Sequence, residues 1–224
     1  MMGSSSVALS VDALLVVLIG LSALAMVVSR QMLALLRLFV VQSVLLGASA
    51  VALAVAAPGK HLYFFAVVTV VSKAIVIPLL LRSTASREIY ATREVDQVLS
   101  IPTALLLSAV LALLAWTLAR PLTAAAGGGI VGLHIAVGVT VLLFGAFAIA
   151  VRREAVAQLL GLLVMENGAF LAGIALVPDM AAIVEVAVAV DVPVVALVLG
   201  LLIRTIHEET GTTAVGRLTD LKEG

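Results

Sequence analysis

The sequence predicts an all-α, polytopic membrane protein with about seven transmembrane helices, its N-terminus outside and its C-terminus in the cytoplasm. Composition is the first reason, because 63% of the 224 residues are hydrophobic and only 12% are charged, whereas soluble domains have about 25% charged residues. The second reason is a series of seven long apolar runs. The third is the uneven distribution of basic residues among the connections between these runs.

Each apolar run is long enough to cross the hydrocarbon core, which requires about 20 residues in a helix. Pro102 lies near the start of the fourth run, where a helix tolerates proline. We expect the first run to be a span rather than a cleaved signal peptide, since no basic residue precedes it. The predicted spans are Val7–Val28, Leu33–Ala57, Leu62–Leu81, Leu99–Leu118, Ile130–Val151, Val156–Val177 and Ala181–Ile206.

Basic residues set the predicted orientation. Ten of them lie in the first, third and fifth connections and in the C-terminal tail, and two lie in the other connections. Because cytoplasmic loops are enriched in Lys and Arg, this pattern favours an odd number of spans with the tail inside. The third connection, 82–98, is expected to be an amphipathic cytoplasmic segment or short helix, and the three glycines at 127–129 predict a flexible outer turn.

Several classes of function are excluded. The chain has no cysteine, which removes disulfides, thiolate metal sites and cysteine-ligated iron–sulfur clusters. Its formal net charge is zero, so it offers no basic surface for nucleic acid. We expect no catalytic residue, cofactor or bound metal in this chain. His61 and His134 are poor candidates for haem ligands, because His61 lies in a connection beside Lys60.

Ionisable residues at bilayer depth are the candidate functional residues, since each costs about 2.5–3.5 kcal/mol on insertion scales. Glu166, followed by Asn167, lies mid-span in the sixth run; it is either a protonatable carboxyl or a protonated acid that binds a neighbouring helix. Gly161 and Gly168 share a face of this run and predict a close helix contact. Lys73 is central in the third run, where it either takes part in function or forms a structural ion pair with a membrane carboxylate.

The seventh run holds two carboxylates. Asp191 is central, and Pro193 frees a backbone carbonyl near it, which suits a proton or cation site. Glu185 lies nearer the outer end, at a depth similar to that of His134 in the fifth run, so the two residues could exchange protons or form a structural hydrogen bond. Gln42, with Ser43 beside it in the second run, could extend the polar path or serve as interhelical contact.

At these residues the chain resembles two related families. From about Ile130 onwards, the chain resembles the NuoK-like subunit of respiratory complex I, through Arg152-Arg153, Gly161 and Met165-Glu166-Asn167. The whole chain is similar to component E of hydrogenase-4 complexes, the HyfE-like proteins. The shared features are Gln42-Ser43, SKAIVIPL with Lys73 and Pro78, Gly132 and His134, LLVMENG with Glu166, VEVAVAVD with Glu185 and Asp191, and the tail segment Leu218–Lys222.

The resemblance implies a membrane-arm subunit of a group 4 hydrogenase or related complex-I-like oxidoreductase in a bacterial or archaeal cytoplasmic membrane. Its partners would be lipid and other membrane subunits, antiporter-like and quinone-module-like, and the redox centres would lie in other chains. Either Asp191 or Glu185 would be the second family carboxylate. The implied organisation is a four-helix region (1–129), a NuoK-like three-helix region (130–206) and a cytoplasmic tail (207–224).

The hypothesis at this point is a subunit whose Glu166 and Asp191 exchange protons, or sodium ions, under the electrostatic influence of Lys73. Two other functions remain open. A structural or assembly scaffold would tolerate neutralisation of these residues. A stand-alone secondary transporter would carry repeated halves and a substrate pocket, and we find no convincing internal repeat in the sequence.

Overall fold

The computed structural model describes residues 2–56, 60–84 and 95–176. In this part of the chain the fold is all-helical, and six helices are long and apolar enough to cross a membrane. The third of these spans combines α3, the π-helical segment η1 and α4. The elements are α1 (Met2–Val28), α2 (Met32–Ala56), α3 (Lys60–Thr69), η1 (Val70–Val76), α4 (Ile77–Thr84), α6 (Ile101–Ala125), α7 (Gly129–Val151) and α8 (Ala155–Leu176).

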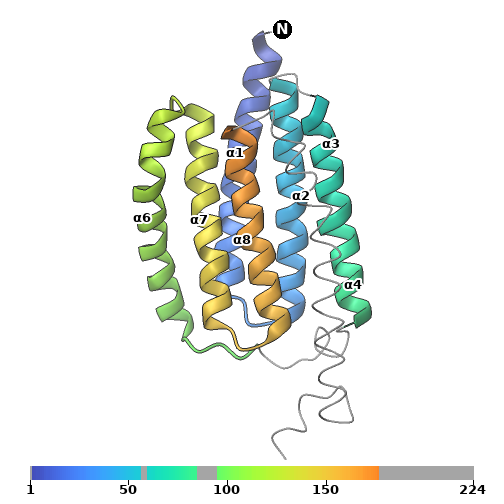
Figure 1. The fold of residues 1–224 in the computed structure, drawn as a ribbon, viewed down its shortest axis with the longest axis vertical. Coiled ribbons are helices and arrows are strands. Elements are labelled where there is room, and N and C mark those ends of the chain that lie inside the picture. Colours follow the sequence, from blue (N-terminus) through green and yellow to red (C-terminus); the bar gives the residue numbers. More distant parts are fainter. Residues whose placement is uncertain (1, 57–59, 85–94, 177–224) are drawn as a thin grey trace, which may run out of the picture.

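The helices lie side by side and run alternately up and down the bundle, as Figure 1 shows. We call the end at which α1 begins the upper end and the opposite end the lower end. Helix α7 packs on α8, α6 and α1, whereas α2 packs on α1, α3, η1 and α8. The six predicted runs up to Val156–Val177 thus correspond to helices, and the seventh, Ala181–Ile206, lies outside the described residues.

The contact between α7 and α8 is built on glycine. A Cβ atom at Gly138 would lie 2.7 Å from the carbonyl oxygen of Gly168, and a Cβ atom at Gly168 would lie 2.6 Å from the carbonyl oxygen of Gly138. Gly145 and Gly161 make the same kind of contact nearer the lower end. The close approach that the glycine spacing predicts is therefore confirmed, and it is the packing expected where small residues let two helix backbones meet.

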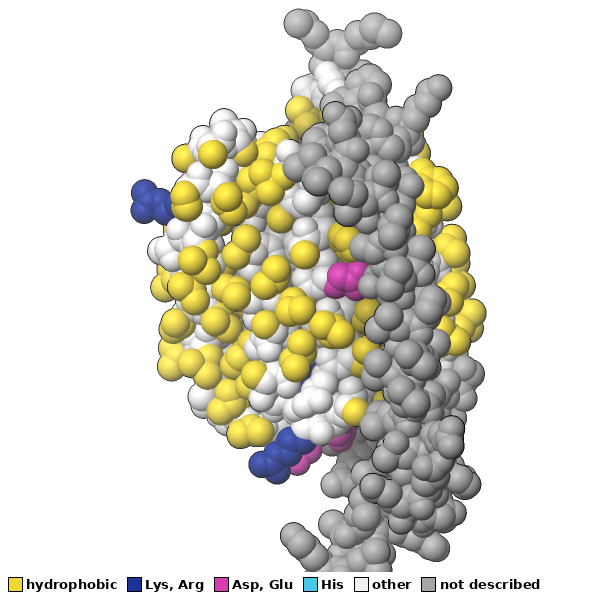
Figure 2. All heavy atoms as spheres, in the orientation of Figure 1, with side chains coloured by type: hydrophobic (Ala, Val, Ile, Leu, Met, Phe, Trp, Pro, Cys, Tyr) yellow, Lys and Arg dark blue, Asp and Glu magenta, His cyan; other side chains and the backbone are white. Residues whose placement is uncertain are grey.

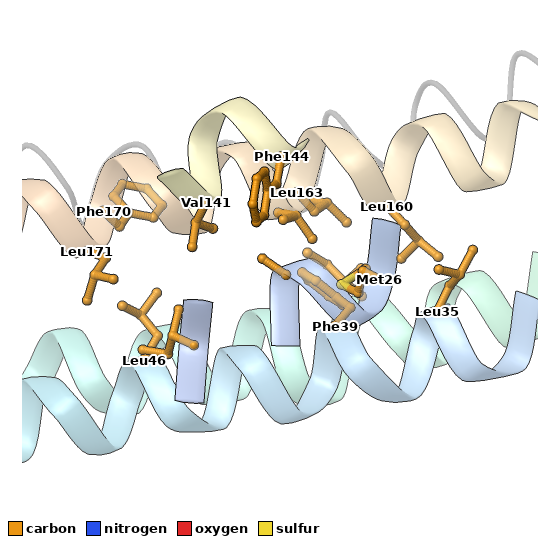
Figure 3. Close-up of a cluster of buried hydrophobic side chains, with 14 of the residues drawn as sticks. Met26, Leu35, Phe39, Leu46, Val141, Phe144, Leu160, Leu163, Phe170 and Leu171 are labelled. Atoms are coloured by element: carbon orange, nitrogen blue, oxygen red, sulfur yellow. The ribbon is translucent and has the colours of Figure 1, made fainter. Parts of the chain in front are cut away.

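Apolar side chains fill the space between the four helices α1, α2, α7 and α8. Figure 3 shows Phe39 of α2 and Met26 of α1 facing Phe144 and Leu163 of α7 and α8. The core is one continuous cluster that includes residues on both sides of position 129. Dense packing of this kind holds the polar side chains within the bundle in fixed positions.

The outer surface of the bundle is strongly apolar. Leu106, Leu113 and Trp116 of α6 are 67%, 68% and 60% exposed. In Figure 2, hydrophobic side chains cover most of the described surface, and charged side chains gather at the lower end, with one basic group at the upper left and one acidic group at mid-height. Such a surface is unsuited to water and is what a multi-pass membrane protein presents to lipid or to other subunits.

The end of the third connection packs against the lower end of the bundle. Val95 N–H donates to the Arg30 carbonyl at 2.6 Å, and Val98 N–H donates to the Val151 carbonyl at 3.0 Å. Gln97 forms an isolated antiparallel bridge with Arg152. Residues 95–99 are thus not helical, and residues 85–94 of the predicted amphipathic segment lie outside the described part.

Arg152 completes this lower end. Its side chain is buried and donates a short hydrogen bond to the Met26 carbonyl, while Gln97 donates to the Val27 carbonyl at 3.3 Å. These bonds satisfy carbonyl groups in the last turn of α1, which have no partner within the helix. Burial lowers the pKa of Arg152 to about 10, and Glu154 opposes this shift, so the guanidinium stays charged at neutral pH.

The end of the fourth span differs from the prediction. The fourth span does not end at Leu118, because α6 continues through Arg120 and Pro121 to Ala125. The helix then ends at glycines 127–129, whose φ angles of 80°, 72° and 61° lie in the left-handed region that glycine adopts readily. The predicted turn is present, and Pro102 lies in the first turn of α6 as expected.

Candidate functional site

Lys73 lies at the middle of the third span, where the helix changes its hydrogen-bonding pattern. Residues Val70–Val76 form a π-helical segment, and the Ile77 N–H donates to the Ser72 carbonyl, five residues earlier. Segments of this kind are rare and often occur at functional sites. The Lys73 side chain is fully buried. A lysine at this depth requires partners inside the bundle, because its charge would otherwise be very costly.

Three residues of α8 provide those partners. The Lys73 Nζ atom lies 3.0 Å from Glu166 Oε1 and donates to Asn167 Oδ1 at 3.1 Å. It also lies 4.4 Å from the centre of the Phe170 ring, within the range of a cation–π contact. These contacts stabilise the ammonium group with one anion, one neutral acceptor and one aromatic face. The Glu166 side chain is 21% exposed, so the pair is not sealed on the carboxylate side.

Asn167 extends the cluster to α2. Its Nδ2 group donates to Gln42 Oε1 at 3.1 Å and approaches Ser43 Oγ at 3.4 Å. Gln42 in turn donates to the Ile19 carbonyl of α1 at 3.4 Å. Each of these amides is completely buried. The result is a polar path that runs across the bundle from α8 and η1 through α2 to α1.

We call Lys73, Glu166, Asn167, Gln42 and Ser43 the midspan cluster. Sequence analysis selected all five as polar residues of three separate runs, and the structure brings them into direct contact. The cluster can hold a buried charge pair, and it can change its net charge by one unit when the carboxyl group gains a proton. An ion pair of this kind in low dielectric is sensitive to any change in the charge beside it.

A second polar cluster lies between the midspan cluster and the upper end. Asp12 Oδ1 accepts a hydrogen bond from Ser49 Oγ at 2.5 Å, and Asp12 Oδ2 lies 3.3 Å from His134 Nε2. Ser49 Oγ is also 3.3 Å from His134 Nε2. All three residues are fully buried, and they come from α1, α2 and α7. We call them the upper cluster.

The upper cluster adds two residues to those selected from the sequence. The predicted pair of His134 with Glu185 stays a prediction, because Glu185 lies outside the described residues; within them, His134 contacts Asp12 and Ser49. Asp12 was overlooked, although an acidic residue six positions into the apolar run Val7–Val28 was a visible signal. Ser49 gave no such signal, since serine is common in membrane helices.

The two predicted carboxylates of the last run lie outside the described residues, so the structure does not relate Glu185 or Asp191 to either cluster. Within residues 2–56, 60–84 and 95–176, no group of three or more His, Cys, Asp or Glu side chains is placed to hold a metal ion.

No family model matches the chain, and no solved structure matches it. The chain is similar to the uncharacterized protein Rv0085 of Mycobacterium tuberculosis, with 26% identity over 151 residues, which cover 67% of this chain and 68% of that protein. The name of this relative states no function.

Proposed function

We propose that this chain is a membrane-arm subunit of a group 4 hydrogenase or related complex-I-like oxidoreductase. Its task would be to contribute the buried carboxyl of Glu166 and the ammonium of Lys73 to proton, or sodium, translocation driven by redox chemistry in other subunits. The observation that carries the proposal is the 3.0 Å contact between these two groups at the middle of the bundle. The resemblance of the chain to hydrogenase-4 component E supports the same assignment.

The proposed step is a change of charge at the midspan cluster. When Glu166 is ionised, it neutralises Lys73, and Asn167 supplies the second polar contact to the ammonium. A positive or negative charge that arrives beside this pair changes the proton affinity of the carboxyl, because buried charges are poorly screened. Glu166 would then take up or release a proton, and its partial exposure allows exchange with groups beyond the described bundle.

The proposal includes a membrane orientation. The lower end, which holds Arg30, Arg152 and Arg153, would face the cytoplasm, as the distribution of basic residues favours. The run Ala181–Ile206 would be the seventh span, with Asp191 or Glu185 as the next group in the path. The membrane would be the bacterial or archaeal cytoplasmic membrane, and antiporter-like and quinone-module-like subunits would be the partners.

The test is ion translocation by the assembled complex in membrane vesicles, measured as protons moved per electron. Glu166→Gln should lose most of the coupled translocation while redox turnover in detergent continues, and Glu166→Asp, which keeps a carboxyl, should recover part of it. Asp96→Asn, a change at an exposed carboxylate of the lower end, serves as the control. Wild-type stoichiometry in Glu166→Gln would contradict the proposal.

A structural scaffold is the second candidate, and the three described contacts of Lys73 with α8 favour it. A scaffold predicts that Lys73→Met together with Glu166→Gln, which removes both charges, supports assembly and normal coupling. If the chain takes part in translocation, the same double variant should assemble normally but should not couple ion movement to redox turnover. A stand-alone transporter would move an ion in vesicles that contain only the purified chain.

A further inference from the structure

We propose that the upper cluster is a second proton-binding site, in which Asp12 Oδ2 and His134 Nε2 share one exchangeable proton. The site is separate from the midspan cluster and contains a residue, Asp12, that the proposed function does not use. The proton would be bound by this chain alone, without coupling to redox chemistry. The directions of the hydrogen bonds within the cluster support such a site.

The ring of His134 is fixed by a hydrogen bond to its own helix. His134 Nδ1 lies 2.9 Å from the carbonyl oxygen of Ile130, one turn earlier in α7. A carbonyl oxygen can only accept a hydrogen bond, so this contact requires a proton on Nδ1. The ring is therefore held in one orientation, and Nε2 is the nitrogen that can gain or lose a proton.

The two carboxyl oxygens of Asp12 have different neighbours. Ser49 Oγ donates to Asp12 Oδ1 at 2.5 Å, which leaves Oδ2 for the histidine. Within the described residues, Oδ2 has no hydrogen-bond partner at ordinary geometry, and its neighbour is Nε2 at 3.3 Å. A bare Nε2 lone pair facing an ionised Oδ2 would be repulsive. One proton between these atoms removes the repulsion and gives the cluster a net charge of zero.

Within the described residues, no other charged group lies in direct contact with this proton. Neither Asp12 nor His134 has a further ion-pair partner in the part of the chain that the structure describes. The nearest elements carry few ionisable groups: Arg120 on α6 is exposed, Tyr63 on α3 is 44% exposed, and Lys60 and His61 begin α3. Arg37 of α2 lies toward the lower end, and Lys73 and Glu166 form the midspan cluster.

The upper cluster lies close to the upper end of the bundle. His134 follows the first residue of α7 by five positions, which corresponds to about 8 Å along the helix. The turn above it consists of glycines 127–129, around which the space for side chains is open. A titratable group this close to one end, and about 10 Å along α2 from the midspan cluster, suits proton loading or release on that side.

The test is nitrogen NMR of the full-length chain in lipid nanodiscs with labelled histidine. The chain has three histidines, so His134→Gln identifies the signals of His134. We expect the Nε2 signal to respond to pH while Nδ1 keeps its proton throughout. Asp12→Asn should lower the proton affinity of Nε2 about tenfold or more, because an anion beside the ring is removed.

Ser49→Ala should also shift the step, whereas Ser108→Ala, a buried serine of α6 that binds only its own helix, should not. A His134 ring whose Nε2 state stays constant over the whole pH range would overturn the proposal, as would a step that Asp12→Asn does not move. A response to sodium instead of pH would also overturn it. Since no partner subunit is present, failure here leaves the redox-coupled role of Glu166 to its own test.

Discussion

The ammonium of Lys73 lies 3.0 Å from the carboxylate of Glu166, which joins the third and sixth spans at the middle of the bundle. Lys73 is fully buried, so its charge has no access to water within the described structure. A buried pair contributes little net stability, because desolvation offsets the attraction, but loss of one partner leaves the other charge buried. The effect on stability of removing either charge therefore depends on whether the other charge is still present.

This dependence can be measured with a double-mutant cycle. We expect Lys73→Met and Glu166→Gln to lower the free energy of unfolding by about 3 kcal/mol each, and the double variant to recover most of that loss. The measurement is denaturant unfolding of the purified chain in detergent micelles. Additive losses in the double variant would show that the two groups do not form a pair in the folded protein.

The glycine contact between α7 and α8 gives a second prediction. In Gly145→Ala, the new methyl group would meet the backbone of Met165 and the Gly161 carbonyl, so we expect a loss of about 1–3 kcal/mol. Gly173→Ala is the matched control, because no atom lies within 4 Å of its added methyl group. Since alanine favours helices, this control should be neutral or slightly stabilising. Equal melting temperatures for the two variants would be inconsistent with the observed packing.

Two adjacent arginines at the lower end should differ sharply. Arg152→Gln removes a buried guanidinium that binds the end of α1, and we expect a loss of about 2–3 kcal/mol. Arg153→Gln removes an exposed pair with Asp96, in which the side chains are 68% and 54% exposed, and we expect a change below about 0.5 kcal/mol. Thermal unfolding in detergent compares the two, and a larger effect at Arg153 would contradict the assigned contacts.

The two clusters should influence each other through space. Gln42 and Ser49 lie seven residues apart on α2, about 10 Å along its axis. Two charges at 10–15 Å with an effective dielectric constant near 20 interact by about 1–2 kcal/mol, or about tenfold in proton affinity. Glu166→Gln should therefore make His134 easier to deprotonate, and Lys73→Met should make it harder. Histidine NMR of both variants checks the opposite signs, and shifts of the same sign would rule out electrostatic coupling.

The helices of the bundle could be predicted from the sequence because each one corresponds to a continuous run of about 20 apolar residues between polar connections. The candidate residues of the midspan cluster could also be selected from the sequence. Polar and charged side chains such as Lys73, Glu166 and Gln42 cost free energy at the middle of a membrane span, so they are rare there and stand out. Their mutual contact could not be derived, since it depends on which helices are neighbours. The spacing of Gly161 and Gly168 indicated that α8 has a close partner but did not identify it as α7.

The upper cluster shows a contact that depth along the spans does not determine. The sequence places His134 and Glu185 at a similar depth, and their pairing stays a prediction because Glu185 lies outside the described residues. The described neighbour of His134, Asp12, has a comparable depth and lies on α1, which packs directly on α7. The lateral order of helices decides between such alternatives, and that order arises from packing between distant segments.

The π-helical segment around Lys73 makes the third span sensitive to its length. Each bond from residue i to i+5 accommodates one residue more than an α-helical bond. Deletion of one residue between Val70 and Val76 would let the segment close as a regular α-helix, while α3 and α4 keep their present faces, because the lost residue is the one that the wider turns accommodate. The residues of the segment itself would change direction, since neighbouring residues of an α-helix differ by about 100°. A single codon deletion beside Lys73 would thus change the direction of the ammonium relative to its carboxylate while the flanking helices stay in place.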